Sequence, residues 1–494
     1  MNTSKATIRR LRTGVPGLDA VLGGGLPEYS FNLIAGPPGC GKTTLAHQIV
    51  FSLATPATPA LYFTILGEPP LKMLRYQQQF DFFDADKVNQ CVRFVNLADD
   101  TASGDLDAVL ARIEQEVRAV SPAVVVVDSF RSVALASHGE GGHARLQQFI
   151  QQLGMLMTSW QATTFLIGEY FTEKDPNPVF TVSDGLLWMF QSVQRNSVVR
   201  KVEVMKMRGQ ATLPGLHTFR ITSGGIEVFA PARAEALAPL APAVGAPAAR
   251  VSTGIAALDD MLGGGLPQGY SLLVAGPSGS GKSILATSFL AEGARLGEHG
   301  VVASFEQGPR RSRDARLNRL VDEGAVSVIA TAAPDLSIDE ATALLLAQVR
   351  SRGARRVVVD SLSSFELALA PTFRDDFRES LAHMVSALAS TGATVLLTSE
   401  LEDRYSDLRF SPYGTAFLTD AIIVQRYVEI DSRLERVMGV VKLRGSAHSN
   451  ELRLFQIDEH GIQLGERLAG HTGLLAGQPR RNGGPVAGGA RSQA

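Results

Sequence analysis

The sequence has little of three features that would indicate particular classes of protein. It contains two cysteines, Cys40 and Cys91, in 494 residues, too few for a disulfide framework and without the paired spacing of a zinc site. No run of about 18 apolar residues occurs, and no apolar segment follows the basic residues before Arg12 as in a signal peptide. These absences predict a cytoplasmic protein without a membrane partner.

An excess of charge of one sign is also missing. Lys and Arg number 47 against 49 Asp and Glu, which gives a formal net charge of -2. Such a balance provides no electrostatic footprint for nucleic acid or an anionic membrane, so nucleic acid is an unlikely partner. The 45% of hydrophobic residues supplies enough apolar material for more than one core.

An internal repeat is the clearest feature that is present. The segment TGVPGLDAVLGGGLP at 13–27 recurs as TGIAALDDMLGGGLP at 253–267, identical at 10 of 15 positions with an offset of 240. An Ala/Pro-rich stretch between the copies is typical of a linker, and the Gly-rich end of the chain is typical of a disordered tail. We therefore expect domains at 1–230 and 251–465, a linker at 231–250 and a tail at 466–494.

Each copy alternates short apolar runs with amphipathic stretches. Expected strands are 31–35, 124–127 and 164–167 in the first copy, and 271–275, 356–359 and 394–398 in the second. Helices are expected between them, as at 105–120 and 339–350. This pattern predicts an α/β fold in both halves, with a central, mostly parallel sheet flanked by helices.

Both copies carry the phosphate-loop pattern G-x-x-x-x-G-K-[ST] directly after an expected strand and before an expected helix. The glycines let backbone N–H groups approach the phosphates, the lysine reaches the β- and γ-phosphates, and the hydroxyl that follows ligates Mg²⁺. The predicted ATP-binding residues are Gly36, Gly39, Cys40, Gly41, Lys42, Thr43 and Thr44, with Gly276, Gly279, Ser280, Gly281, Lys282, Ser283 and Ile284 in the second copy.

A carboxylate for the metal follows a buried strand in each copy. Asp128 ends VVVVD and Asp360 ends VVVD, at the carboxyl edge of a sheet, where ligands bind in open α/β folds. An aspartate in this position can also cap a helix. Next to a phosphate loop, however, the pattern favours Mg²⁺ sites formed by Thr43 with Asp128 and by Ser283 with Asp360.

These motifs together resemble one known family. LD-x-x-LGGGLP before each loop, VVVDS at the metal strand and K-x-R-G late in each copy are similar to the KaiC-like family of tandem RecA-type ATPases. The resemblance implies a homohexamer with ATP at subunit interfaces. It also implies that Lys206 and Arg208, and Lys442 and Arg444, reach a neighbour's nucleotide; the alternative is a solvated basic pair at a strand end.

The sequence departs from this family in the segments around Leu66 and Glu306, where the family places two adjacent glutamates, after its second strand, that activate the attacking group. Leu66 and Gly67 occupy those positions in the first copy, with Glu68 displaced by one residue, whereas the second copy keeps Glu306. Because a carboxylate accepts a proton, Glu306 is the predicted catalytic base. We expect the first site to bind ATP and hydrolyse it slowly, and the second site to turn over.

A second departure concerns autophosphorylation, which the resemblance also implies. Ala416 and Phe417 replace the family's Ser-Thr acceptor pair, although Ser411, Thr415 and Thr419 lie nearby. Glu169 and Glu400 follow equivalent strands in the two copies. They are interpreted either as sensors of the γ-phosphate or as solvated residues at the ends of strands. The leading interpretation is a signalling or timing ATPase with a protein partner; a DNA-handling ATPase and a nucleotide-gated scaffold remain alternatives.

Overall fold

The computed structural model describes most of the chain, in two compact units that divide after Pro231. The described residues are 8–65, 70–102, 105–136, 142–172, 177–194, 197–231, 249–305, 314–330, 336–369, 377–401, 418–468, 471–472 and 480–481. Each unit is described by itself below. No helix in these ranges is long and apolar enough to cross a membrane.

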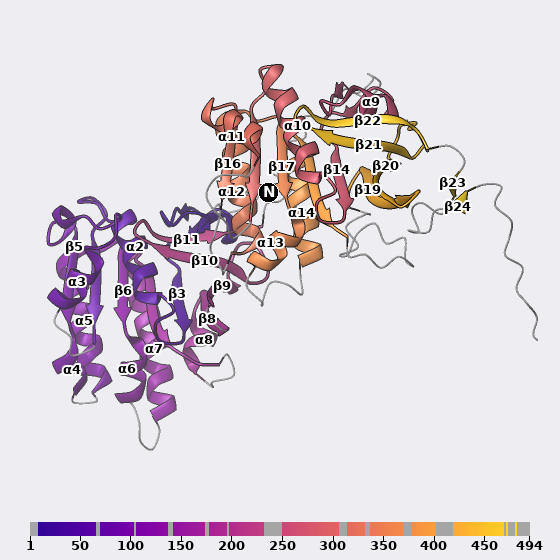
Figure 1. Ribbon diagram of the computed structural model, residues 1–494. Helices are drawn as coiled ribbons and strands as arrows, with labels where there is room; N and C mark the ends of the chain where they lie inside the picture. The colour runs from indigo at the N-terminus through magenta and orange to yellow at the C-terminus, as the bar shows by residue number, and fades with distance from the viewer. Residues whose placement is uncertain are drawn as a thin grey trace, which may run out of the picture. The chain divides into compact units, whose positions relative to one another are not determined.

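The first unit is a nine-stranded sheet with helices on both faces (Figure 1). Its strands are β3 (Phe31–Gly36), β4 (Ala60–Thr64), β5 (Val92–Asn96), β6 (Val124–Asp128), β7 (Thr163–Glu169), β8 (Gly185–Gln194), β9 (Ser197–Met207), β10 (His217–Thr222) and β11 (Gly225–Phe229). They lie in the order β11-β10-β9-β8-β3-β7-β6-β4-β5, parallel from β8 to β5 and antiparallel from β8 to β11. A short pair, β1 (Arg10–Leu11) with β2 (Leu26–Pro27), stands beside it.

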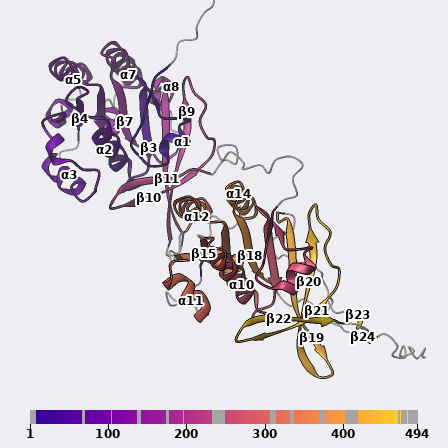
Figure 2. The same cartoon turned by 90° about the horizontal axis from the view of Figure 1, so that it is seen from above.

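The helices of the first unit divide between the two faces of this sheet. They are α1 (Leu18–Val21), α2 (Lys42–Leu53), α3 (Pro70–Gln77), α4 (Ala98–Ala102), α5 (Leu106–Val120), α6 (Phe130–Ala136), α7 (Gly142–Ser159) and α8 (Pro178–Val182), with a 3₁₀ turn, η1 (Ala85–Lys87). Because successive strand side chains point to opposite faces, Ile34 packs in the core under α2, and its neighbour Leu33 packs under α5 and α7. Figure 2 shows α2 and α7 on opposite sides of the strands.

The second unit repeats this arrangement. Its strands are β14 (Ser271–Gly276), β15 (Gly300–Ser304), β16 (Val326–Ala330), β17 (Arg356–Asp360), β18 (Thr394–Glu400), β19 (Ala421–Ile430), β20 (Arg433–Leu443), β21 (Arg453–Asp458) and β22 (Gly461–Arg467). Their order, β16-β15-β17-β18-β14-β19-β20-β21-β22, corresponds strand for strand to the first sheet. Short pairs are β12 (Arg250–Val251) with β13 (Leu266–Pro267), and β23 (His471–Thr472) with β24 (Arg480–Arg481).

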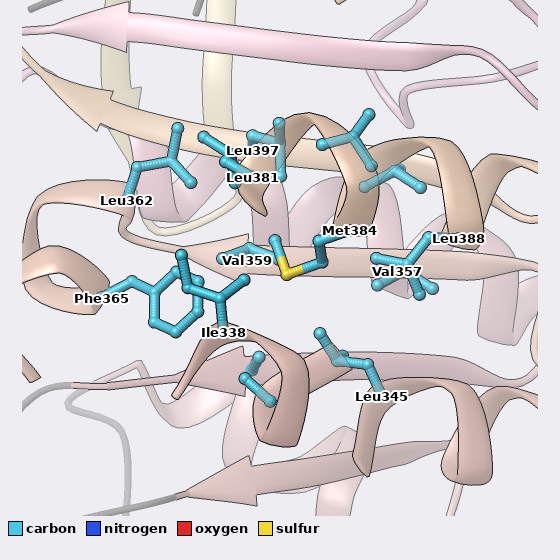
Figure 3. Packing of buried hydrophobic residues seen from close by; sticks show 14 of the residues in the cluster. Ile338, Leu345, Val357, Val359, Leu362, Phe365, Leu381, Met384, Leu388 and Leu397 are labelled. Carbon is cyan, nitrogen blue, oxygen red and sulfur yellow. The ribbon is translucent and has the colours of Figure 1, made fainter. Parts of the chain in front are cut away.

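The helices of the second unit are α9 (Ala256–Met261), α10 (Lys282–Arg295), α11 (Ala315–Asp322), α12 (Ile338–Arg352), α13 (Leu362–Ala368) and α14 (Phe377–Ala389). The core between the sheet and α12, α13 and α14 is drawn in Figure 3. Phe365 is fully buried there, with its ring stacked 4.2 Å from that of Phe305. Phe305 directly follows β15, so this aromatic pair packs at the end of that strand.

Local signals explain where the predicted helices begin and end. Asp105 caps α5 by accepting hydrogen bonds from the N–H groups of Asp107 and Ala108, and Ser337 caps α12 by accepting from Glu340. Gly353 ends α12 in the left-handed conformation that glycine adopts without strain. The predicted α/β class, with two tandem mostly parallel sheets, is confirmed.

Candidate nucleotide sites

The first phosphate loop connects β3, at the centre of its sheet, to α2. Gly41 directly precedes α2 at φ 106°, and Gly281 directly precedes α10 at φ 104°. Glycine enters this left-handed region without the steric cost that other residues meet. Since glycine has no side chain to cap the helix, the first N–H groups of each helix remain available to an anion. Both predicted loops therefore have the local backbone of a phosphate site.

The two loop lysines are folded back onto their own loops. Lys42 Nζ donates to the carbonyl oxygens of Gly36 at 3.0 Å and Pro37 at 2.7 Å. Lys282 Nζ donates to the same two positions of the second loop, at 2.9 and 2.8 Å. Burial lowers the pKa of Lys282, against the opposing effect of Glu400 and Asp360. Each ammonium is thus held among carbonyl oxygens beside the space that phosphates would occupy.

The two predicted Mg²⁺ ligands of the first site, Thr43 and Asp128, are in direct contact. Thr43 Oγ1 donates to Asp128 Oδ2 at 2.9 Å, and the hydroxyl of Tyr62 donates to the same oxygen at 2.8 Å. Burial raises the pKa of Asp128, and the hydrogen bonds from Tyr62 and Thr43 counteract it. A hydroxyl and a carboxylate oxygen side by side are hard ligands that fit Mg²⁺.

The second site holds its carboxylate differently. Asp360 Oδ1 accepts a hydrogen bond from Thr398 on β18, whereas Ser283 is exposed at the start of α10. Register places the two aspartates equivalently, because Asp128 lies beside Thr64 and Asp360 beside Ser304. The carboxylates therefore match in the backbone and differ in their hydrogen-bond donors.

A cavity of about 350 Å³ opens over the first loop. Its lining includes Gly39, Gly41, Lys42, Thr43, Thr44, Asp128 and Glu169, together with Thr64, Met73, Ser129, Ile167 and Ile221. The size and the mixture of polar and apolar walls are typical of small-ligand sites. Met73 on α3 and Ile221 on β10 were missed by sequence reasoning, because only the tertiary fold brings these segments to the loop. Glu169, for which a γ-phosphate sensor and a solvated strand end were the two alternatives, lies in this lining.

A second cavity, of about 390 Å³, lies beside α10 in the other unit. Its lining is Ile284, Thr287, Asp314, Ala315, Arg316, Asp458, Glu459 and Gly461. Ile284 is the one predicted nucleotide-binding residue in this lining. The turn between β21 and β22 contributes Asp458, Glu459 and Gly461 to this lining.

The K-x-R residues do not meet the phosphate loop of their own unit. Lys206 Nζ donates to the carbonyl oxygen of Thr181 at 3.0 Å, and Arg208 pairs with Asp184 at 3.1 Å. Asp184 in turn accepts from the N–H of Phe31, the first residue of β3. The loop begins after Gly36 at the other end of that strand.

The second unit repeats this placement of its K-x-R pair. Lys442 donates to the carbonyl oxygen of Thr419, and Arg444 pairs with Asp420 at 3.5 Å. The same Asp420 accepts from the N–H of Ser271, the first residue of β14. The cations of both units therefore lie at the edge of the sheet opposite their own loop.

Several predicted residues lie outside the described ranges. They are Glu306, the predicted base, with Leu66, Gly67 and Glu68, and the acceptor positions Ser411, Thr415, Ala416 and Phe417. Thr419 is described and is fully buried, so it is a poor phosphoacceptor in this fold. Cys40 is also buried, and burial raises the pKa of its thiol, which disfavours the reactive thiolate.

Comparison with known proteins agrees with this geometry. The family model described as "ATPase: KaiC" matches residues 11–233 and again 251–469. The chain is 26% identical to the circadian clock oscillator protein KaiC of Rippkaea orientalis, over 97% of this chain and 94% of that protein. It is 27% identical to the circadian clock protein KaiC3 of Synechocystis sp., over 96% and 95% of the two chains. With two matched domains that cover most of its length, the chain belongs to the KaiC ATPase family.

Proposed function

We propose that the chain binds and hydrolyses ATP with Mg²⁺ at two unequal sites. The observation that carries this proposal is the cavity over the first loop, where Lys42, Thr43 and Asp128 converge. Backbone N–H groups at the start of α2 and α10 would bind the phosphates, and Lys42 and Lys282 would leave their loop carbonyls for the β- and γ-phosphates. Thr43 with Asp128, and Ser283 with Asp360, would hold Mg²⁺, which neutralises the phosphate charge that develops during transfer.

The two sites differ in the group that would activate water. Glu306 follows β15 by two residues, and β15 ends beside Asp360. A carboxylate there would accept the proton of the attacking water. In the first copy Leu66 and Gly67 occupy the corresponding positions. The first site would thus mainly bind ATP, whereas the second would turn over.

Activity would depend on assembly. Lys206 and Arg208, and Lys442 and Arg444, lie away from their own loops, so a neighbouring subunit is the natural recipient of these cations. A cation delivered to the γ-phosphate raises turnover by about 10³ to 10⁵. A head-to-tail contact that closes by rotation generates a ring, and a homohexamer is the ring that we propose.

The biological role that fits best is signalling or timing through a protein partner that reads the nucleotide state. The relatives named above are circadian clock proteins by name. Residual autokinase activity is a lesser part of the proposal, and phosphate on any residue between Ser411 and Thr419 would establish it. The near-neutral charge supports a protein partner over DNA; strongly salt-dependent binding of single-stranded DNA would reverse that preference.

Phosphate release by the wild type, Lys42→Ala and Lys282→Ala proteins tests the central claim. We expect Lys282→Ala to remove most of the hydrolysis and Lys42→Ala to remove little. Glu306→Gln should match Lys282→Ala in rate and still bind ATP. The double variant Lys42→Ala/Lys282→Ala gives the background rate. If the wild type binds ATP but releases phosphate no faster than this double variant, the chain is a nucleotide-gated scaffold.

A further inference from the structure

Tyr62 has no part in the motifs that define the nucleotide site, yet it touches the metal carboxylate. It lies on β4, its side chain is fully buried, and its hydroxyl donates to Asp128 Oδ2 at 2.8 Å. In this hydrogen bond the phenol hydroxyl is the donor, because a carboxylate oxygen accepts. Thr43 donates to the same oxygen. Within the described residues Asp128 Oδ1 carries no hydrogen bond, and Asp128 lines the cavity over the first loop.

The ring of Tyr62 is held in place from α2. His47 lies one helical turn after Thr43, and its imidazole stacks on the Tyr62 ring with centroids 4.4 Å apart and planes 9° from parallel. The ring of Phe94 on β5 also packs against Tyr62, with the two ring centroids 5.4 Å apart. His47 is itself fully buried, and neither of its nitrogens has a hydrogen-bond partner among the described residues. Its contribution here is therefore a flat surface that fixes the direction of the Tyr62 hydroxyl.

Among the described residues of the second unit, no tyrosine takes the place of Tyr62. Tyr62 pairs with Val126, two residues before Asp128; the residue that pairs with Val358, two before Asp360, is Val302. A valine has no hydroxyl to donate. Thr287 stands where His47 does, five residues after the loop lysine, and donates to Asp314 on another element. The donor to Asp360 is Thr398 from the opposite neighbouring strand.

We propose that Tyr62 is a positioning residue of the first site, which holds the Asp128 carboxylate in the orientation that receives the Mg²⁺ of a Mg²⁺-nucleotide. This inference rests on the proposed function in taking the first loop as a nucleotide site. Outer-shell partners that orient a ligating carboxylate typically change metal affinity by about 10- to 100-fold. Tyr62 would thereby favour tight Mg²⁺-nucleotide binding at the site that lacks the catalytic glutamate.

Tyr62→Phe isolates the hydroxyl, because phenylalanine keeps the ring and its stack on His47. The variant is made in a Lys282→Ala background, so that binding reports the first loop. Calorimetry then measures the affinity for the slowly hydrolysed analogue adenylyl imidodiphosphate, once with excess Mg²⁺ and once with EDTA. Tyr29→Phe, which removes a hydroxyl at the far end of β3, is the matched control.

We expect Tyr62→Phe to lower the affinity with Mg²⁺ by about tenfold and to leave the affinity in EDTA within about twofold. Equal affinities of variant and parent in Mg²⁺, or an equal fall in both conditions, would overturn the positioning role. Trp160 and Trp188 are the two tryptophans of the chain and both lie in the first unit, so their fluorescence verifies its folding. Failure of the parent to bind at all would instead refute the proposed nucleotide site.

Discussion

The K-x-R cations of the second unit should act on the nucleotide of a neighbouring subunit. Arg444 pairs with Asp420 beside Ser271, at the start of β14, and the phosphate loop follows Gly276 at its end. At about 3.3 Å per residue the two ends of β14 are about 17 Å apart. That separation exceeds the length of a lysine or arginine side chain, so Lys442 and Arg444 cannot reach their own loop in this fold.

Mixing two inactive variants tests this prediction. Lys282→Ala lacks a working second loop and keeps the cations; the double variant Lys442→Ala/Arg444→Ala keeps the loop and lacks them. Each should lose at least about 10³-fold of second-site turnover. After subunit exchange at equal amounts, about one in four head-to-tail interfaces combines an intact loop with intact cations. Phosphate release should therefore recover to about a quarter of the wild-type second-site rate.

A mixture that stays as inactive as its components would refute action across subunits. The matched control mixes Lys282→Ala with Glu306→Gln, whose lesions both lie on the loop-bearing side of an interface. No interface in that mixture joins an intact loop to an intact base, so no recovery is expected. Recovery in the control as well would mean that the subunits complement by another route.

Three further predictions concern stability and reactivity. Burial lowers the pKa of His47 from 6.5 to about 3. As the pH falls below 6.5, the unfolded chain therefore takes up a proton at His47 before the folded chain does. The free energy of unfolding consequently falls between pH 6.5 and pH 3, and this loss is absent above pH 6.5. Between pH 7 and pH 5 the free energy of unfolding, monitored by tryptophan fluorescence, should fall by about 2 kcal/mol more in the wild type than in His47→Phe, at about 1.4 kcal/mol per pH unit. Equal losses in the two proteins would contradict this. Phe365 is buried in the core of the second unit (Figure 3), so Phe365→Ala should lower the stability of this unit by about 3 to 5 kcal/mol. The unfolding transition seen by circular dichroism should shift, whereas the transition seen by tryptophan fluorescence, which reports the first unit, should stay unchanged. Cys40 and Cys91 are both buried, so a thiol reagent should label neither before unfolding, and rapid labelling of the native protein would argue against the loop geometry.

Strand prediction succeeded because parallel strands covered on both faces are almost purely apolar. The run VVVVD predicted both β6 and the place of Asp128 at the carboxyl end of that strand, and the structure puts that aspartate beside Thr43. The helix expected at 339–350 is found as α12 (Ile338–Arg352), with Ser337 and Gly353 as its caps. The Phe365 and Phe305 stack was not, because it joins residues 60 positions apart that share no local pattern.

The sequence by itself determined the duplicated α/β architecture, the backbone of both glycine-rich loops and the place of Asp128 and Asp360 at strand ends, because each depends on short-range chemistry such as glycine φ angles, strand burial and helix starts. Only the tertiary structure decided that Tyr62 and His47 support Asp128, that Met73 and Ile221 line the first cavity, and that the K-x-R cations lie away from their own loops. Those relations depend on which strands become neighbours and in which register. Strand order and register arise from the packing of the whole sheet, which no local run of residues encodes.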